Sequence, residues 1–219
     1  MRPIRTALLI ACVAAPLGAQ NVGATIDRAV AAWAKVKTVR GTFEQTVTNQ
    51  ITGSSATARG RYVQERPNRL SIRFSEPASD AIVADGKAVW IYLPSTAAGQ
   101  VIKRPATEPG ATPIDLTGQF LDSPRAKYDI TAAGTKAVDG HSTHALKLVP
   151  KKGTNAPFTQ ATVWVDDDDA LIREFEETEP SGVTRHVRLT AIETNPTVDR
   201  SVFTFTVPSG VKIVDQSRP

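Results

Sequence analysis

Two of the three histidines, His141 and His144, have the clearest potential for metal chemistry. Their spacing of three positions could present two imidazole rings to one ion. A zinc site, however, needs three or four ligands in register, usually with cysteine or an acid among them. Because the pair follows Asp139-Gly140, which is typical of a turn, we expect both histidines to lie in a surface loop and to bind no metal.

Four consecutive aspartates, Asp166 to Asp169, form the second candidate cluster. Calcium prefers oxygen ligands, but an EF-hand spaces them along a loop and adds a glycine and a terminal glutamate. The run here has no such spacing, and it lies between two strand-like segments, 161–165 and 171–175. A solvated hairpin turn is therefore the simpler interpretation.

Motifs for covalent catalysis and for cofactors are not found in the sequence. It contains no G-x-S-x-G nucleophile elbow, no G-x-G-x-x-G and no phosphate-binding loop. Its one cysteine, Cys12, lies close to the N-terminus. We therefore expect a protein that is not an enzyme and that binds no cofactor.

The N-terminus has the pattern of an export signal. Arg2 and Arg5 precede an apolar stretch over 6–15, and small residues up to Ala19 offer a cleavage site before Gln20. The stretch is about half of the ~20 residues that a membrane-spanning helix needs. We expect 1–19 to be a signal peptide and 20–219 to be one domain. The alternative is a lipobox at 9–12, which would place a lipid on Cys12.

The charge of the chain is nearly balanced. The formal net charge is +4, and removal of the two arginines in residues 1–19, which contain no acid, leaves +2. No basic stripe interleaved with aromatic residues is visible. The sequence therefore argues against nucleic acid as a partner.

Hydrophobic periodicity predicts one helix followed by many short strands. Apolar residues at spacings of three and four favour a helix over 22–39, and from Thr42 the period changes to two. Turn residues separate the strand-like segments, which indicates an antiparallel meander in a mainly β protein. Besides the strands that begin at Thr42 and Arg69, we expect strands at 57–65, 80–84, 88–93, 100–104, 127–131, 144–150, 160–166, 171–177, 183–193 and 202–206.

A short helix is expected to interrupt the sheet. Thr112 could cap it and Pro113 could occupy its first turn. The helix would run from Ile114 to Leu121, with Ile114, Leu116 and Phe120 on an apolar side. A large sheet with a small apolar helix suggests a sheet with a lid over 112–122.

Two strands indicate where an apolar ligand could bind. Leu70, Ile72 and Phe74 alternate with Arg69, Ser71 and Arg73, so that one face is apolar and the other solvated. Segment 88–93 is apolar on both faces. The core of an ordinary sandwich and a concave sheet that holds an apolar ligand explain this pattern equally well.

Several motifs spread along the chain resemble the LolA family of periplasmic lipoprotein carriers. They follow the first helix in the order and spacing of that family. They are GTFEQ at 41–45, GRY at 60–62, RPNRL at 66–70, Pro77, IVADGK at 82–87, VWIY at 89–92, TP at 112–113, FTF at 203–205 and PSGV at 208–211.

The resemblance implies an unclosed β-barrel, or half-barrel, with helices near 22–39 and 112–122 as a lid and an apolar interior for acyl chains. Arg66 matches the family arginine that hydrogen-bonds to the lid and holds the empty form shut. The resemblance also implies a monomeric periplasmic carrier with lipoproteins as cargo, an inner-membrane ABC transporter as donor and an outer-membrane receptor as acceptor. Residues expected at the cavity and lid are Phe43, Leu70, Ile72, Phe74, Trp90, Tyr92, Ile114, Leu116 and Phe120.

Two other functions remain open at this point. Related folds include a lipidated outer-membrane lipoprotein receptor, which acylation of Cys12 would indicate. They also include periplasmic lipid-sensing regulatory domains.

Overall fold

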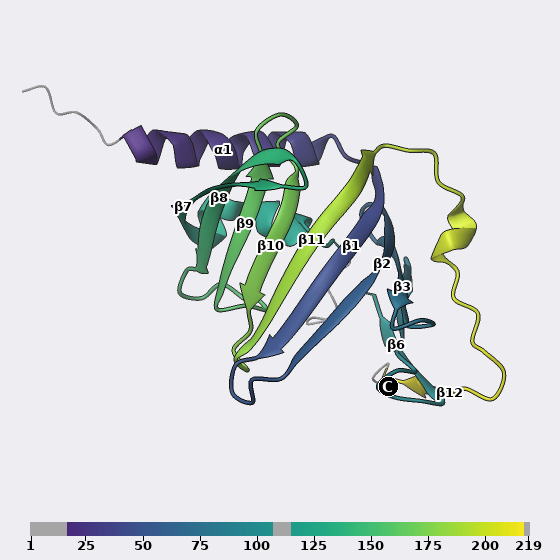
Figure 1. Cartoon of the computed structure of the whole chain (residues 1–219). Helices are drawn as coiled ribbons and strands as arrows, with labels where there is room; N and C mark the ends of the chain where they lie inside the picture. Colours follow the sequence, from purple (N-terminus) through teal and green to yellow (C-terminus); the bar gives the residue numbers. More distant parts are fainter. Residues whose placement is uncertain (1–16, 107–114, 217–219) are drawn as a thin grey trace, which may run out of the picture.

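Twelve strands form one curved sheet that does not close (Figure 1). The computed structural model of the chain describes residues 17–106 and 115–216. The strands are β1 (Thr38–Asn49), β2 (Ser55–Glu65), β3 (Arg69–Glu76), β4 (Ala81–Asp85), β5 (Ala88–Tyr92), β6 (Gln100–Pro105), β7 (Tyr128–Val138), β8 (His141–Pro150), β9 (Gln160–Asp166), β10 (Ile172–Thr178), β11 (Val183–Thr194) and β12 (Lys212–Asp215).

The strand order confirms the mainly β, unclosed antiparallel architecture. It runs β12-β6-β5-β4-β3-β2-β1-β11-β10-β9-β8-β7, so β12 and β7 lie at the two edges. All neighbours are antiparallel except β12, which runs parallel to β6. Two meanders meet where β1 pairs with β11, two strands that lie far apart in the sequence.

Helix α1 (Leu17–Ala34) covers one end of the sheet, above β7 to β11 in Figure 1. Its buried residues Ile26, Ala29 and Trp33 follow the spacing of three and four that predicts a helix. The expected end at residue 39 is wrong, since the helix ends at Ala34 and β1 begins at Thr38. The β-branched pair at 38–39 joins the sheet instead, where Val39 pairs with both β2 and β11.

The remaining helices are short. They are α2 (Gly118–Leu121), α3 (Pro124–Lys127) and the 3₁₀ helix η1 (Arg200–Phe203). The expected helix from Ile114 is shorter, since residues 115–117 form a bend and a turn. Thr112, Pro113 and Ile114 lie outside the described residues, as do residues 1–16. No helix in the described ranges is long and apolar enough to cross a lipid bilayer.

The C-terminal segment differs most from the expected strands. Residues 202–206 form no strand, because η1 and an extended connection occupy this stretch. The segment runs from β11 along the outside of the sheet to β12 (Figure 1, yellow). Strand β12 itself was not predicted. Val202 lies near Ser71, and Arg73 donates a hydrogen bond to the Thr204 carbonyl at 3.2 Å. This cover explains why Ser71 is buried, although we expected that face to be solvated.

The histidine pair and the aspartate run contact each other where β8 and β9 lie side by side. His141 and His144 lie in β8, not in a loop, and their Nδ1 atoms contact Asp166 at 2.8 Å and Asp167 at 2.5 Å. The run does connect β9 to β10, but Asp166 is fully buried, and Arg173 Nε donates to it at 2.7 Å. The interpretation of this run as a solvated turn is therefore wrong for Asp166. The described residues contain no cluster of three or more side chains suited to a metal.

A second buried carboxylate, Glu174, lies on the face of the sheet opposite to α2. Its side chain is 1% exposed, and it contacts Lys136, His186 Nε2 at 2.6 Å and Arg188 Nε at 3.5 Å. Burial alone would raise the pKa of Glu174, but the hydrogen bonds from His186 and Lys136 lower it to about 2. Glu174 thereby joins β10 to β7 and β11.

The Glu174 cluster predicts a loss of stability in acid. A carboxylate with a lowered pKa in the folded state stabilises the fold above its ordinary pKa of 4.5, and this contribution is lost as the pH falls towards 2. We expect on the order of 3 kcal/mol, seen as a falling free energy of unfolding between pH 5 and 2. Glu174→Gln should flatten this slope. Glu176→Gln, at an exposed position of the same strand, should leave it unchanged.

Candidate ligand-binding cavity

A cavity of about 320 Å³ lies between the concave face of the sheet and the segment around α2. Its walls come from β1, β3, β4, the β5 end, β10 and β11, and residues 116 and 119 cover it. The apolar lining residues are Phe43, Ile72, Phe74, Ile82, Ile91, Leu93, Leu116, Phe175 and Val187. The polar lining residues are Gln45, Gln119, Glu177 and Arg185.

A glycine in β2 allows the aromatic part of this wall to form. The rings of Phe43 and Phe74 meet edge to face, with centroids 5.3 Å apart. A Cβ atom on Gly60 would lie 2.8 Å from the Phe43 ring and 2.3 Å from the Arg73 carbonyl oxygen. Only glycine therefore lets β2 pass this close to both neighbours.

The structure brings four of the expected cavity residues together: Phe43, Ile72, Phe74 and Leu116. Leu70 and Phe120 lie in the adjoining core, where they are 1% and 0% exposed. Phe120 packs against the cavity-lining residue Phe175, with ring centroids 5.1 Å apart. Ile114 lies outside the described residues.

Trp90 and Tyr92 are not brought to the cavity. They lie on the other face of β5, where Phe205 of the C-terminal segment packs on them with centroid distances of 5.8 and 5.7 Å. Ile91 and Leu93 line the cavity instead. The sequence of a strand that is apolar on both faces does not indicate which face points inward. In β5, Phe205 of the C-terminal segment covers the face with Trp90 and Tyr92, so the other face points into the cavity.

Arg66, in the turn between β2 and β3, connects the end of α1 to the segment before α2. Its Nη1 atom donates to the carbonyl oxygens of Trp33 at 2.8 Å and Val36 at 3.1 Å. Its Nε atom lies 3.5 Å from the Asp115 carboxylate. Helix C-termini leave carbonyl groups without helical partners, and a guanidinium group can satisfy several of them at once.

Asp115 completes this junction and was missed by the sequence reasoning. Its Oδ2 atom also accepts a hydrogen bond from Trp33 Nε1 at 3.2 Å, and its Oδ1 atom accepts one from the Gly118 backbone amide at 2.7 Å. A Cβ atom on Gly118 would lie 1.9 Å from the carboxylate. An aspartate three residues before a glycine at a helix start is the signal that could have found it.

Electrostatics inside the cavity centre on one buried acid. Glu177 is 6% exposed, and its Oε1 atom lies 3.7 Å from Arg185 Nη1. Burial raises the pKa of Glu177, and the positive charge of Arg185 opposes this shift. The neighbouring Glu179 carboxylate adds to the rise. The cavity is thus mainly apolar, with the Glu177–Arg185 pair in its wall.

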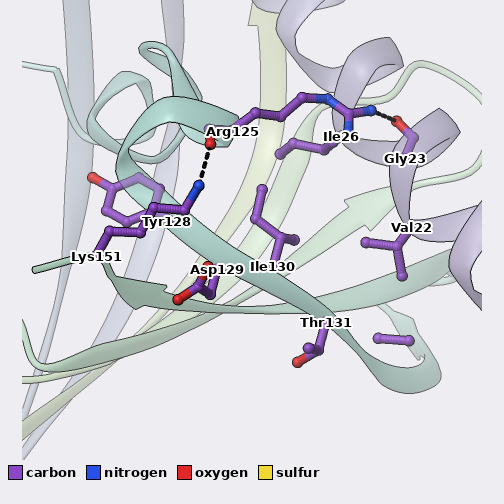
Figure 2. A pocket seen from close by; sticks show the side chains of 10 residues that line it. Val22, Gly23, Ile26, Arg125, Tyr128, Asp129, Ile130, Thr131 and Lys151 are labelled. Carbon is purple, nitrogen blue, oxygen red and sulfur yellow. Dashed lines mark hydrogen bonds between the residues drawn. The ribbon is translucent and has the colours of Figure 1, made fainter.

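A larger groove of about 480 Å³ lies between α1 and β7 (Figure 2). Val22, Ile26 and Ile130 form its apolar side. Arg125 crosses it, donating to the Gly23 carbonyl at 3.1 Å and pairing with Asp27. The cationic Arg125 side chain crosses the groove. The groove therefore suits an apolar chain less well than the cavity beneath α2 does.

Comparison with known proteins decides the family. The model of the outer membrane lipoprotein carrier protein LolA matches residues 34–206. The chain belongs to the LolA family. Its relatives include outer-membrane lipoprotein carrier proteins from Salmonella paratyphi A and Proteus mirabilis. The first is 31% identical, over 98% of each chain. The second is 26% identical, over 97% of this chain and 100% of the relative.

A solved structure shares the fold of this LolA family member. An uncharacterized conserved protein from Thermus thermophilus has a TM-score of 0.55 and 13% sequence identity. The match covers 90% of this chain and all of the other. This likeness concerns the fold alone, and it agrees with the single open sheet described above.

Proposed function

We propose that the protein is a non-enzymatic carrier that holds the acyl chains of lipoproteins in the cavity beneath α2. The observation that carries this proposal is the cavity itself, with nine apolar lining residues under a small segment of chain. Each methylene moved from water into such a site contributes about 0.8 kcal/mol. The lipoprotein carriers among its relatives support the same cargo.

Binding requires the cavity to open. About 320 Å³ is near the lower limit of the ~300–1,000 Å³ typical of small-molecule sites, so long acyl chains would need more room than the cavity offers here. We call residues 115–121 the lid segment. In our proposal, cargo displaces it and breaks the contacts of Arg66 with α1 and Asp115. Closure then offsets part of the binding free energy and favours release.

The route we propose runs between two membranes. The carrier takes lipoproteins from an inner-membrane ABC transporter and gives them to an outer-membrane receptor, as a monomer in the periplasm. The transporter would supply the energy for loading, and the carrier itself needs only two states of the lid segment.

Export predicts a defined N-terminus. We propose that residues 1–19 are removed, so the intact mass of the protein purified from a bacterial periplasm should correspond to a chain that starts at Gln20. Cleavage there would remove residues 17–19 from the start of α1 and leave the helix from Gln20 to Ala34. A mass that instead includes acylated Cys12 would favour the anchored receptor.

Transfer of a labelled lipoprotein tests the function directly. Membrane vesicles that contain the transporter and the lipoprotein are mixed with ATP and the purified protein, and soluble lipoprotein–carrier complex is measured. The lipoprotein should leave the membrane only when the protein is present. A lipoprotein that stays in the membrane, with no acyl chain bound to the protein, would exclude the carrier function.

A further inference from the structure

A groove of about 660 Å³ lies on the outer face of the sheet, opposite to the face that lines the cavity beneath α2. Its floor comes from β1, β2, β3 and β11, and Val202 of η1 forms one side. Its charged lining residues are three arginines and one acid, so their formal charge is +2: Arg40, Arg61, Arg73 and Glu193. The proposed carrier function requires none of these side chains.

Two of the three arginines have no carboxylate partner among the described residues. Arg40 pairs with Glu193 at 2.6 Å. The Arg73 side chain has one hydrogen bond, from Nη2 to the Thr204 carbonyl oxygen at 3.2 Å. The Arg61 side chain, within the part of the chain that the structure describes, has no hydrogen bond or ion pair. Most donors of Arg61 and Arg73 are therefore available to a ligand.

The unpaired guanidinium groups belong to opposed residues. Arg61 in β2 and Arg73 in β3 are direct strand partners, and like charges at such positions destabilise a sheet. Partial burial lowers the pKa of the Arg73 guanidinium, which means that its surroundings disfavour the charge. An anion bound by both arginines would remove the repulsion and supply the missing opposite charge.

The charge and the donors of the pair select a phosphate group among anions. A phosphate monoester has a charge of about −1.5 to −2 and three acceptor oxygens, whereas a carboxylate has one charge and two oxygens. Each guanidinium group is a planar fork that can bind two oxygens of one anion. Two forks with two positive charges therefore match a terminal phosphate better than a carboxylate.

We propose that Arg61 and Arg73 form a binding site for a terminal phosphate group on the outer face of the sheet. The Thr204 carbonyl holds Arg73 in place, and the phosphate oxygens accept from the remaining donors of both arginines. The groove also has room for an organic group on the phosphate, beside Val63 and Val202. A soluble phosphate and a lipid headgroup that ends in phosphate present the same chemistry. The site does not depend on the carrier function.

Calorimetric titration of the purified protein with inorganic phosphate tests the site, with acetate as the comparison. We expect phosphate to bind at least about tenfold more tightly than acetate. Arg61→Gln and Arg73→Gln should each weaken phosphate binding by at least about tenfold, because each removes charge-assisted hydrogen bonds. Arg59→Gln is the matched control, since Arg59 lies on the same face of β2 but pairs with Glu44 and Glu76. Equal binding of phosphate and acetate, or phosphate binding that survives in both variants, would overturn the site.

The unfolding temperature distinguishes binding from a structural role of Arg61. Arg61→Gln removes a repelling charge and breaks no side-chain contact to another described residue, so in chloride buffer it should unfold at the same temperature as the unchanged protein or higher. In phosphate of equal ionic strength the unchanged protein should instead unfold at the higher temperature, because only it gains stability from the ligand. An equal loss of stability in both buffers would make Arg61 a structural residue and overturn its role in binding.

Vesicles identify the source of the phosphate. The protein is sedimented with phosphatidylcholine vesicles that contain either phosphatidic acid, which ends in a phosphate, or phosphatidylglycerol, which does not. Stronger binding to phosphatidic acid that Arg61→Gln abolishes, and that the cavity variant Ile91→Glu keeps, supports a lipid headgroup. Equal binding to both lipids, or binding that Arg61→Gln keeps, excludes the headgroup in favour of a soluble phosphate if inorganic phosphate binds. If neither inorganic phosphate nor phosphatidic acid binds through Arg61, the proposal is overturned.

Discussion

Arg66→Leu is expected to slow the transfer of a labelled lipoprotein from this protein to a receptor by at least about tenfold, although the variant still binds cargo. Arg66 holds the carbonyl oxygens of Trp33 and Val36 and faces Asp115. Hydrogen bonds to a charged group contribute about 1.5–3 kcal/mol each, whereas a tenfold change needs only about 1.4 kcal/mol. Loss of these contacts therefore suffices to shift the lid segment towards its open state.

Two other variants make this test specific. Arg69→Leu is the matched control, because Arg69 pairs with Glu65 in the same turn and should leave transfer nearly unchanged. Arg66→Lys should restore transfer only partly, since an ammonium group cannot replace the planar fork of donors. Normal transfer by Arg66→Leu would mean that the junction between α1 and the lid segment does not control release.

Ile91→Glu should reduce the affinity for a fatty-acid probe by at least about a hundredfold. Ile91 lines the cavity opposite Ile82, with no positive side chain among its direct strand partners, Ile82 and Ile102. A carboxylate placed there must either lose its hydration or take up a proton, and both cost several kcal/mol. Displacement titration with a fluorescent probe measures the loss, and circular dichroism checks that the fold is kept.

Ile213→Glu provides the same change of side chain outside the cavity. Ile213 lies in β12 at the sheet edge and is 46% exposed, so its replacement should leave probe binding within a factor of two or so. Equal losses in the two variants would show that added charge, and not the position in the cavity, weakens binding.

Local periodicity predicts most of the strands in this protein. The alternation of Leu70, Ile72 and Phe74 with polar residues places all three on the inward side of β3, and the structure agrees. The order of short motifs was enough to indicate the LolA family, and the family model confirms it. These features depend on residues close in sequence, which is why a single sequence contains them.

The features that the sequence did not predict depend on contacts between residues that lie far apart in the chain. The inward side of β5 depends on Phe205, more than a hundred residues away, and the burial of Ser71 depends on the segment around Val202. His141 looked like a loop residue because its partner Asp166 joins it only when β8 and β9 pair. Asp115 was missed because its role depends on Arg66 and Trp33, which reach it from other elements.

The pairing of β1 with β11 has a consequence for the timing of folding. The two halves of the sheet meet only at this seam, which joins residues near 40 to residues near 190. Closing so long a loop costs entropy before any seam contact forms, and proteins rich in such contacts fold slowly. Strand β1 pairs early with β2, the next strand in the chain, but we infer that most of the chain must have emerged before β1 finds its second partner, β11. A chain exported from its N-terminus would therefore cross the membrane with its lipid site still unassembled, and could capture no acyl chain on the way.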